Sequence, residues 1–157
     1  MSNPQIFIAS DHAGFELKKI ISQFLLEENY VLTDLGPEIY DPTDDYPDFS
    51  TKLAKKIAEN PQERKGIIIG GSGQGEAMAA NRTLGVRAAV FYGYPQNLHS
   101  ELDVIALSRE HNDANILAIG SRFVSPPIAK EAVLKWLRTS FPPEERHIRR
   151  ISELDKQ

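Results

Sequence analysis

The sequence predicts an α/β fold: a Rossmann-like three-layer αβα sandwich built on a five-stranded parallel sheet. Short apolar runs alternate along the chain with longer segments whose apolar residues recur at helical spacing. One run, Ile67-Ile68-Ile69, is apolar at consecutive positions, as expected for a strand that is buried on both faces. Glycines at 70, 71, 73 and 75 follow it, and then come helix-forming residues. Repeated strand–helix units of this kind build a parallel sheet with helices on both faces.

Two strand–helix units are expected in the first part of the chain. Residues 5–10 (QIFIAS) and 30–35 (YVLTDL) indicate the strands. A helix over residues 14–28 is indicated by apolar residues at helical spacing, and a second helix follows from Phe49 to Ala58. Asn60-Pro61 ends that second helix, because a residue before proline disfavours helical backbone. Residues 36–47, rich in proline and acidic residues, form a long loop before it.

The remaining units follow the same alternation. The isoleucine strand leads through the glycine loop into a helix that begins at Glu76. Residues 87–92 (RAAVFY) and 116–119 (ILAI) indicate the last two strands, with a helix over 98–109 between them. Pro126-Pro127 opens the last long helix, since proline suits a first helical turn, and Pro142-Pro143 ends it. The charged tail, residues 144–157, contains a short helix.

Length and composition limit the classes of function. The 157 residues are enough for a single domain spanning residues 1–157. A net charge of −4 argues against a nucleic-acid partner, and the absence of cysteine excludes disulfides and thiolate catalysis. The N-terminal residues lack the pattern of a signal peptide, and no apolar run approaches the roughly 18 residues of a membrane span. We therefore expect a cytoplasmic protein with no membrane partner.

Ligands of such sheets bind outside the carboxyl ends of the strands, which brings three polar segments together here. Asp11-His12 follows the first strand, the glycine loop with Glu76 follows the third, and Arg122 follows the fifth. The loop from Gly71 to Gly75 offers bare backbone N–H groups beside a helix N-terminus, which suits an oxyanion. It can also be a tight structural turn. A dinucleotide site is disfavoured, because the glycine spacing differs from G-x-G-x-x-G and no ribose-binding acid follows.

Each of the other polar candidates has two interpretations. Glu76 either stabilises the helix macrodipole or acts as a general base beside an oxyanion hole, and the two are compatible. Asp11 either caps the following helix or orients a ligand that His12 contacts. His111 and Asn112 form either a polar helix end or a proton donor to a ligand oxygen.

The tail is locally basic in an acidic chain. Arg146, Arg149 and Arg150 recur at helical spacing, with His147 between them. They form either a solvated basic face or a phosphate grip, for which guanidinium groups are well suited. We expect an anionic substrate and a tail, residues 144–157, that packs on a partner subunit.

Several of these motifs together resemble the ribose-5-phosphate isomerase B family, whose wider group includes the galactose-6-phosphate isomerase subunits. The resemblance runs in the same order over nearly the whole chain. It is carried by Asp11-His12-Ala13-Gly14, Asp45-Tyr46-Pro47, Gly71-Ser72-Gly73-Gln74-Gly75-Glu76 with Ala79-Ala80-Asn81, Arg109-Glu110-His111-Asn112-Asp113-Ala114-Asn115, Gly120-Ser121-Arg122, and Arg146-His147 with Arg150.

The resemblance implies a homodimeric or tetrameric aldose–ketose isomerase of the pentose phosphate pathway that needs no metal and no cofactor. It would interconvert ribose 5-phosphate and ribulose 5-phosphate through a cis-enediolate, with one base moving a proton from C2 to C1. Some members use a cysteine at the end of the third strand as that base, but the matching residue here is Gly70. Other members use a glutamate just after the glycine loop, the position of Glu76.

The resemblance also assigns roles to the other motif residues. Residues Gly71, Ser72, Gly73, Gln74 and Gly75 would hold the enediolate oxygen, and the Ser72 hydroxyl would assist. His111 would protonate the ring oxygen. Sugar hydroxyls would be bound by Asp11 and Asn112, and Tyr46 would line the pocket. The phosphate would be held by His12, Arg122, Arg146 and Arg150, some of them from the partner subunit.

One segment departs from the family pattern. Residues 92–108 are longer than the family leads us to expect and lie next to His111, so we expect them to shape the pocket mouth or the dimer interface. Three other functions stay open. They are a hexose-6-phosphate isomerase acting on allose or galactose phosphate, a sugar-phosphate-binding protein without catalysis, and a nucleotide-binding module.

Overall fold

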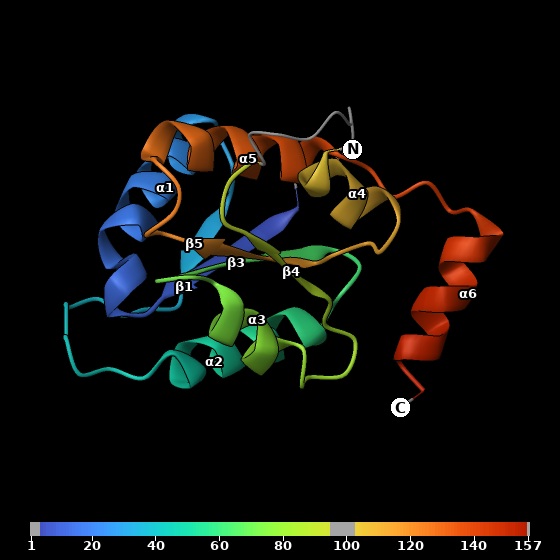
Figure 1. Ribbon diagram of the computed structural model, residues 1–157, viewed down its shortest axis with the longest axis horizontal. Coiled ribbons are helices and arrows are strands. Elements are labelled where there is room, and N and C mark those ends of the chain that lie inside the picture. Colours follow the sequence, from blue (N-terminus) through green and yellow to red (C-terminus); the bar gives the residue numbers. More distant parts are fainter. Residues whose placement is uncertain (1–3, 95–102, 157) are drawn as a thin grey trace.

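The computed structural model describes residues 4–94 and 103–156, in which five parallel strands lie between two layers of helices (Figure 1). The predicted αβα sandwich with a five-stranded parallel sheet is confirmed. The strands are β1 (Gln5–Ser10), β2 (Leu32–Asp34), β3 (Arg64–Gly70), β4 (Ala88–Phe91) and β5 (Ile116–Gly120). The helices are α1 (Phe15–Glu27), α2 (Tyr46–Ala58), α3 (Gln74–Ala80), α4 (Val104–Glu110), α5 (Pro126–Arg138) and α6 (Glu145–Leu154), with a 3₁₀ turn η1 (His12–Gly14) before α1.

The strand order explains where a ligand can bind. The order is β2-β1-β3-β5-β4, and every neighbouring pair is parallel. The chain leaves β1 outward to β2 and then crosses back to β3 on the other side of β1. Because the two connections diverge at the carboxyl ends of β1 and β3, they leave a crevice there.

The sheet has an apolar core on each face. Ile67 and Ile69 of β3 lie in the core under α1, α4 and α5, whereas Ile68 lies in the core over α2 and α3. All three side chains are fully buried. Burial of each one stabilises the fold by about 1.5–3 kcal/mol, so this strand fixes both helical layers at once.

Helix starts differ from the prediction for local reasons. Helix α3 begins at Gln74 rather than at Glu76, because Gly73 takes a left-handed φ of 75° and so ends the turn immediately before it. Helix α2 begins at Tyr46 rather than at Phe49, with Pro47 in its first turn, where a missing N–H costs nothing.

The predicted helix over residues 98–109 is only partly described. The structure shows α4 from Val104, and Asp103 caps it by accepting from the N–H groups of Ile105 and Ala106. The rest of that prediction and most of the longer segment, residues 95–102, lie outside the described residues.

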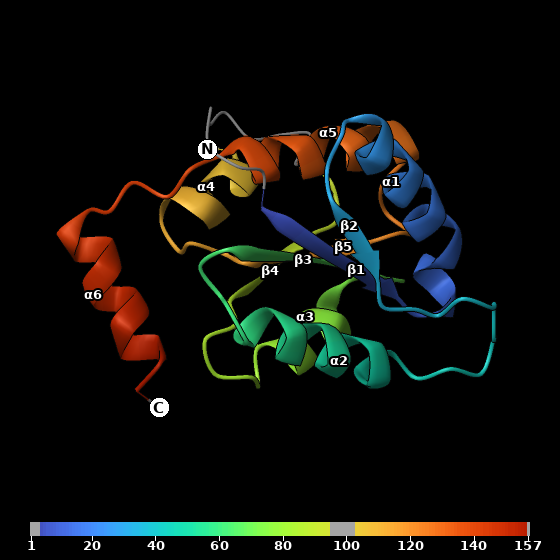
Figure 2. The same ribbon diagram turned by 180° about the vertical axis from the view of Figure 1, so that it is seen from behind.

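Helix α6 stands beyond the β4 edge of the sheet, away from both helical layers, in both views (Figures 1 and 2). His147 is its only buried residue among those described, while Ile148 and Leu154 are about half exposed. Among the helices of residues 4–94 and 103–156, none is long and apolar enough to cross a membrane.

Candidate functional site

A pocket of about 280 Å³ opens at the carboxyl ends of β1, β3 and β5. This is the crevice that the strand order creates, and it gathers most of the sequence-predicted site residues. Its walls are formed by Asp11, His12, Ala13, Tyr46, Gly71, Ser72, Gly75, Glu76, Arg122 and Phe123.

The carboxylate of Glu76 fills the space directly above Gly70. A Cβ atom at position 70 would overlap the Oε1 and Cδ atoms of Glu76. The glycine at the end of β3 therefore lets the first turn of α3 fold its acidic side chain back over the strand. Residue 70 and the carboxylate compete for one volume, so a side chain at one position displaces the other group.

Glu76 is buried beside a second carboxyl group, that of Asp11. Their exposed fractions are 3% and 7%. Burial raises the pKa of Glu76, and the charge of Asp11 and a hydrogen bond with Asp11 raise it further. Asp11 also caps η1 by accepting from the N–H of Gly14 at 3.0 Å, which is the first of the two interpretations of this residue. A carboxyl group whose pKa is raised is protonated more easily than an exposed one, which suits it to take up and return a proton.

The glycine loop presents unpaired donors to the same pocket. Within residues 4–94 and 103–156, the N–H groups of Gly71, Ser72, Gly73 and Gly75 donate no hydrogen bond. Only the N–H of Gln74 is engaged, by the Ser72 hydroxyl at 3.3 Å. Gly73 is required here, since its left-handed backbone brings its Cα within reach of β5, where a Cβ would lie 3.1 Å from a backbone carbon of Ile119. Four free N–H groups beside a buried carboxyl group can hold an oxyanion.

His12 and Arg122 are the side chains of the pocket that can bear a positive charge. Asp44 accepts from the backbone N–H of His12 at 2.9 Å and contacts its ring Nδ1 at 2.7 Å. The hydrogen bond to Asp44 raises the pKa of His12. The sequence prediction missed Asp44, because its signal was only one acid among several in the loop over residues 36–47, and nothing local shows which of them turns toward His12.

The other predicted site residues form a second cluster. The rings of His111 and His147 stack with their centres 4.6 Å apart and a 14° angle between their planes. Burial lowers the pKa of His147, and the charges of Arg146, His111 and Arg150 lower it further. The burial of His147 against His111 was also missed, since the sequence showed only that it lay among arginines.

The two clusters lie at opposite ends of the strands, which we call the carboxyl edge and the amino edge of the sheet. Asp11 and Arg122 follow the carboxyl ends of their strands, whereas His111 and Asn112 immediately precede β5 at its amino end. A strand advances about 3.3 Å per residue, so the five residues of β5 keep the clusters apart. A single chain therefore does not bring His111, Asn112, Arg146 and Arg150 to the pocket that holds Glu76.

A buried ion network fixes the backbone that carries His111 and Asn112. Asp113 accepts from Arg109 at 2.7 Å and from Arg87 at 3.0 Å. The same two guanidinium groups donate to the backbone carbonyls of Asn112, Asp113 and Ala114. Asp113 has a left-handed φ of 45°, so the turn needs these contacts to hold it.

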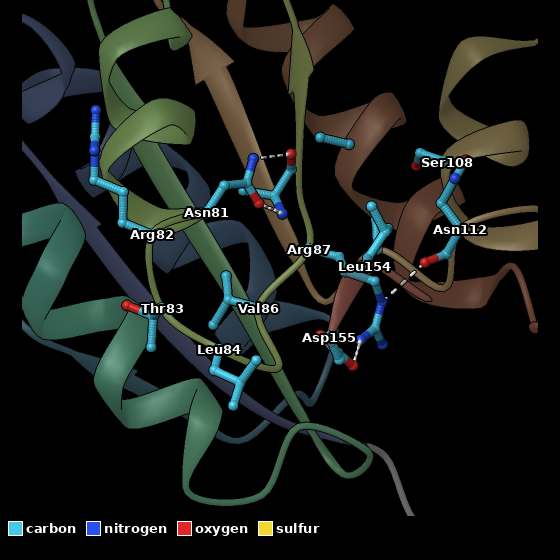
Figure 3. A pocket seen from close by; sticks show the side chains of 13 residues that line it. Asn81, Arg82, Thr83, Leu84, Val86, Arg87, Ser108, Asn112, Leu154 and Asp155 are labelled. Carbon is cyan, nitrogen blue, oxygen red and sulfur yellow. Dashed lines mark hydrogen bonds and ion pairs between the residues drawn. The ribbon is translucent and has the colours of Figure 1, made fainter. Parts of the chain in front are cut away.

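A larger hollow of about 550 Å³ lies between the end of α6 and the body of the protein (Figure 3). In the figure Arg87 lies between Asn112 and Asp155, and it contacts a carboxylate oxygen of Asp155 at 4.0 Å. The remaining wall mixes polar and apolar side chains, with Leu84 and Leu154 on facing sides. Arg87 and Asp155 contact each other there, whereas the buried carboxyl group of Glu76 and the glycine loop line the smaller pocket at the carboxyl edge, which remains the candidate site.

No group of three or more histidine, aspartate or glutamate side chains is arranged to hold a metal ion in the part of the chain that the structure describes. The pocket contains two carboxyl groups, backbone N–H donors, the guanidinium group of Arg122 and the imidazole ring of His12.

Comparison with known proteins gives consistent matches. The family model for ribose/galactose isomerases matches residues 6–154. The chain is 36% identical over 154 residues to ribose-5-phosphate isomerase B of Mycobacterium tuberculosis, covering 98% of this chain and 90% of that protein. A crystal structure of ribose-5-phosphate isomerase B from Mycoplasma genitalium with bound ribulose 5-phosphate is 42% identical, with a TM-score of 0.87 over 97% of this chain and 94% of that one. The enzyme from Thermotoga maritima has a TM-score of 0.88 at 36% identity, covering 99% of this chain and all of that one.

Proposed function

The chain belongs to the ribose/galactose isomerase family, and from this premise we propose that it is an aldose–ketose isomerase interconverting ribose 5-phosphate and ribulose 5-phosphate. The observation that carries the proposal is the buried carboxyl group of Glu76 beside four unpaired backbone N–H groups. Isomerisation needs a base that removes a carbon-bound proton and donors that hold the oxygen on which charge develops.

Glu76 is the base in this proposal. It takes the proton from C2, and a cis-enediolate forms. The same carboxyl group returns the proton to C1 while a second proton passes from the C2 hydroxyl to O1, which leaves the carbonyl at C2. Because burial raises its pKa, the protonated intermediate state of Glu76 is less costly at neutral pH than that of an exposed glutamate. Asp11, which shares the buried site, binds a sugar hydroxyl and keeps the pKa of Glu76 high.

The glycine loop supplies the oxyanion hole. The free N–H groups of residues 71–75 and the Ser72 hydroxyl stabilise the enediolate oxygen, and one such donor is typically worth about 3–4 kcal/mol of barrier. His12 and Arg122 bind the phosphate from one side of the pocket, and Tyr46 lines it.

The remaining roles require a second copy of the chain. His111, as the acid that opens the sugar ring, Asn112, as a ligand of a hydroxyl group, and the phosphate-binding Arg146 and Arg150 lie at the far edge of the sheet. We infer that they complete the pocket of a partner subunit in a homodimer. The position of α6 beyond the body supports this arrangement, because its exposed Ile148 and Leu154 leave an apolar face for a partner to cover.

The test of reaction class is a direct assay. Purified protein should convert ribose 5-phosphate to ribulose 5-phosphate, and the rate should not change when a chelator is added. Side-by-side rates on allose 6-phosphate and galactose 6-phosphate separate the pentose from the hexose substrate. Protein that binds ribose 5-phosphate but makes no ketose would instead be a binding protein, and the proposal would be wrong.

The test of the base is the exchange of the C2 proton with solvent. Glu76→Gln keeps the size of the side chain, so sugar-phosphate binding should change little, while exchange should fall by about 10²–10⁴-fold. Glu63→Gln, a change of the same kind at an exposed position, is the matched control and should exchange as the wild type does. Exchange at the wild-type rate in Glu76→Gln would remove Glu76 as the base.

A further inference from the structure

His12 and Asp44 form a contact that the reaction scheme does not use. Asp44 lies 32 residues further along the chain, in the loop before α2, and one of its oxygens, Oδ1, accepts from both the backbone N–H and the ring Nδ1 of His12. The Asp44 side chain is only 8% exposed, and that of His12 is 31% exposed. One carboxylate oxygen thus fixes both the position of the backbone and the orientation of the ring.

This contact fixes the tautomer of the histidine. A carboxylate only accepts hydrogen bonds, so Nδ1 must carry a proton in both charge states of the ring. The two states then differ only at Nε2. It accepts a hydrogen bond when the ring is neutral and donates one when the ring is charged. A phosphate oxygen needs a donor, so only the charged ring can bind it through Nε2.

The charges around His12 favour the charged ring. Asp44, Asp11 and Asp41 are the negative groups that face it, and Arg122 is the positive group that opposes them. Glu76 lines the same pocket. The hydrogen bond to Asp44 is the largest of these influences, and it raises the pKa of His12, while burial and Arg122 act in the opposite direction.

The second carboxylate oxygen of Asp44, Oδ2, makes no competing hydrogen bond in the described part of the chain, so the carboxylate interacts with His12 alone. Oδ2 is buried and has no hydrogen-bond partner among the described residues. An unsatisfied buried oxygen costs stability, and an anchor for the loop alone would need only the bond to the backbone N–H. The negative charge is retained beside a ring that it can hold in the charged form.

We propose that Asp44 is a positioning residue that keeps His12 doubly protonated, so that the pocket binds the dianionic phosphate group of its substrate at a pH where an isolated histidine would be neutral. The inference rests on the proposed function for the identity of the phosphate ligand. The second proton of a phosphate ester leaves near pH 6, so above that pH the ligand is a dianion and gains most from a donor at Nε2.

The kinetic test compares the pH dependence of KM in matched variants. Asp44→Asn keeps Oδ1 as an acceptor for the backbone N–H but removes the charge. Below pH 6 its KM for ribose 5-phosphate should match the wild type, and as the pH rises toward 8 it should become roughly tenfold higher or more, with kcat little changed. Glu38→Gln removes an exposed charge from the same loop that does not act on the ring, and it should follow the wild type. Asp44→Glu should recover part of the loss.

The direct test does not need catalysis. Nuclear magnetic resonance titration of the His12 ring in the free protein should give a pKa above 6.5 in the wild type and a clearly lower one in Asp44→Asn. Inorganic phosphate should bind more weakly to Asp44→Asn at pH 8 but equally well below pH 6. A protein that fails the isomerase assay yet shows these shifts would overturn the proposed function and leave the role of Asp44 standing. An unchanged titration, or a loss of binding that is equal at all pH values, would overturn the role of Asp44.

Discussion

The two edges of the sheet carry chemistry in different ways. At the carboxyl edge, backbone N–H groups and a glutamate held over Gly70 form a pocket whose parts belong to one chain. At the amino edge, His111 and Asn112 lie on a turn fixed by the ion network of Arg87, Arg109 and Asp113.

The groups at the two edges are held in place by different interactions. The carboxyl edge is organised by chain geometry, since strand order and glycine positions place its groups. At the amino edge, buried ion pairs hold the turn, and the side chains of His111 and Asn112 are exposed. We interpret the carboxyl edge as the reaction centre of this chain. The amino edge would supply residues to the reaction centre of a partner subunit.

The largest expected effect comes from mixing two inactive variants. Glu76→Gln removes the base at one edge, and His111→Ala removes the acid at the other, so each homodimer should lose activity by about 10²–10⁴-fold. A hybrid dimer has one site with both defects and one with neither if the edges combine across subunits. Random pairing makes about half of the dimers hybrids with one intact site each, so co-refolded variants should regain up to about a quarter of the wild-type activity in the isomerase assay.

The control for this experiment is a mixture of each variant with itself, treated in the same way, which should stay inactive. If the two edges served one site within one chain, every site in the hybrid would carry a defect. A hybrid as inactive as its parents would therefore contradict the division of the site between two chains.

The amino edge should depend on charge for its stability. Asp113→Asn keeps the side-chain size and tolerates the left-handed backbone. It leaves Arg109 buried without a counter-charge and Arg87 with only the 4.0 Å contact to Asp155, both beside the buried Lys65. Breaking a buried ion pair in this way typically costs about 3–5 kcal/mol in the free energy of unfolding, to be measured by urea denaturation. Asp155→Asn, whose more exposed side chain lies 4.0 Å from Arg87, should cost less than about 1 kcal/mol.

The sequence predicted the carboxyl edge better than the amino edge, for a physical reason. Consecutive isoleucines, glycines and strand–helix alternation are local signals, and the rule for parallel sheets converts them into a shared crevice. That was enough to bring Asp11, Glu76 and Arg122 to one pocket.

Contacts between distant side chains had no such signal. The bond from His12 to Asp44 spans 32 positions and depends on how a loop folds back, and the stack of His111 on His147 depends on where α6 comes to lie. The start of α3 at Gln74 was missed by two residues because the sequence does not show that Gly73 alone takes the left-handed backbone.

The carboxyl edge should depend on volume rather than on charge. Gly70→Ala adds one methyl group in the space that the Glu76 carboxylate occupies, so the carboxylate must move. Because a displacement of about 1 Å can cost a factor of roughly 10², we expect kcat to fall by that order with a smaller change in KM. Gly85→Ala lies away from the pocket but strains a backbone with a φ of 79°, so it should lower stability without lowering kcat. Normal turnover in Gly70→Ala would show that the observed position of Glu76 is not the productive one.

The smallest expected effect is a change in the free energy of unfolding. Removing the charge of Glu76 should stabilise the protein, whereas removing the charge of Asp113 should destabilise it. The folded protein raises the pKa of Glu76 above its ordinary value of 4.5, so it holds this proton more tightly than the unfolded chain does. Stability is therefore lost as the pH rises from that value through the raised pKa, and ionised Glu76 costs stability at neutral pH. Glu76→Gln removes this cost and should raise the free energy of unfolding at pH 8 by about 0.5–2 kcal/mol, with a gain that disappears in acid. Urea titrations of both proteins from pH 4 to pH 8 measure the difference. A loss of stability at pH 8, as expected for Asp113→Asn, would mean that both edges are held by charge.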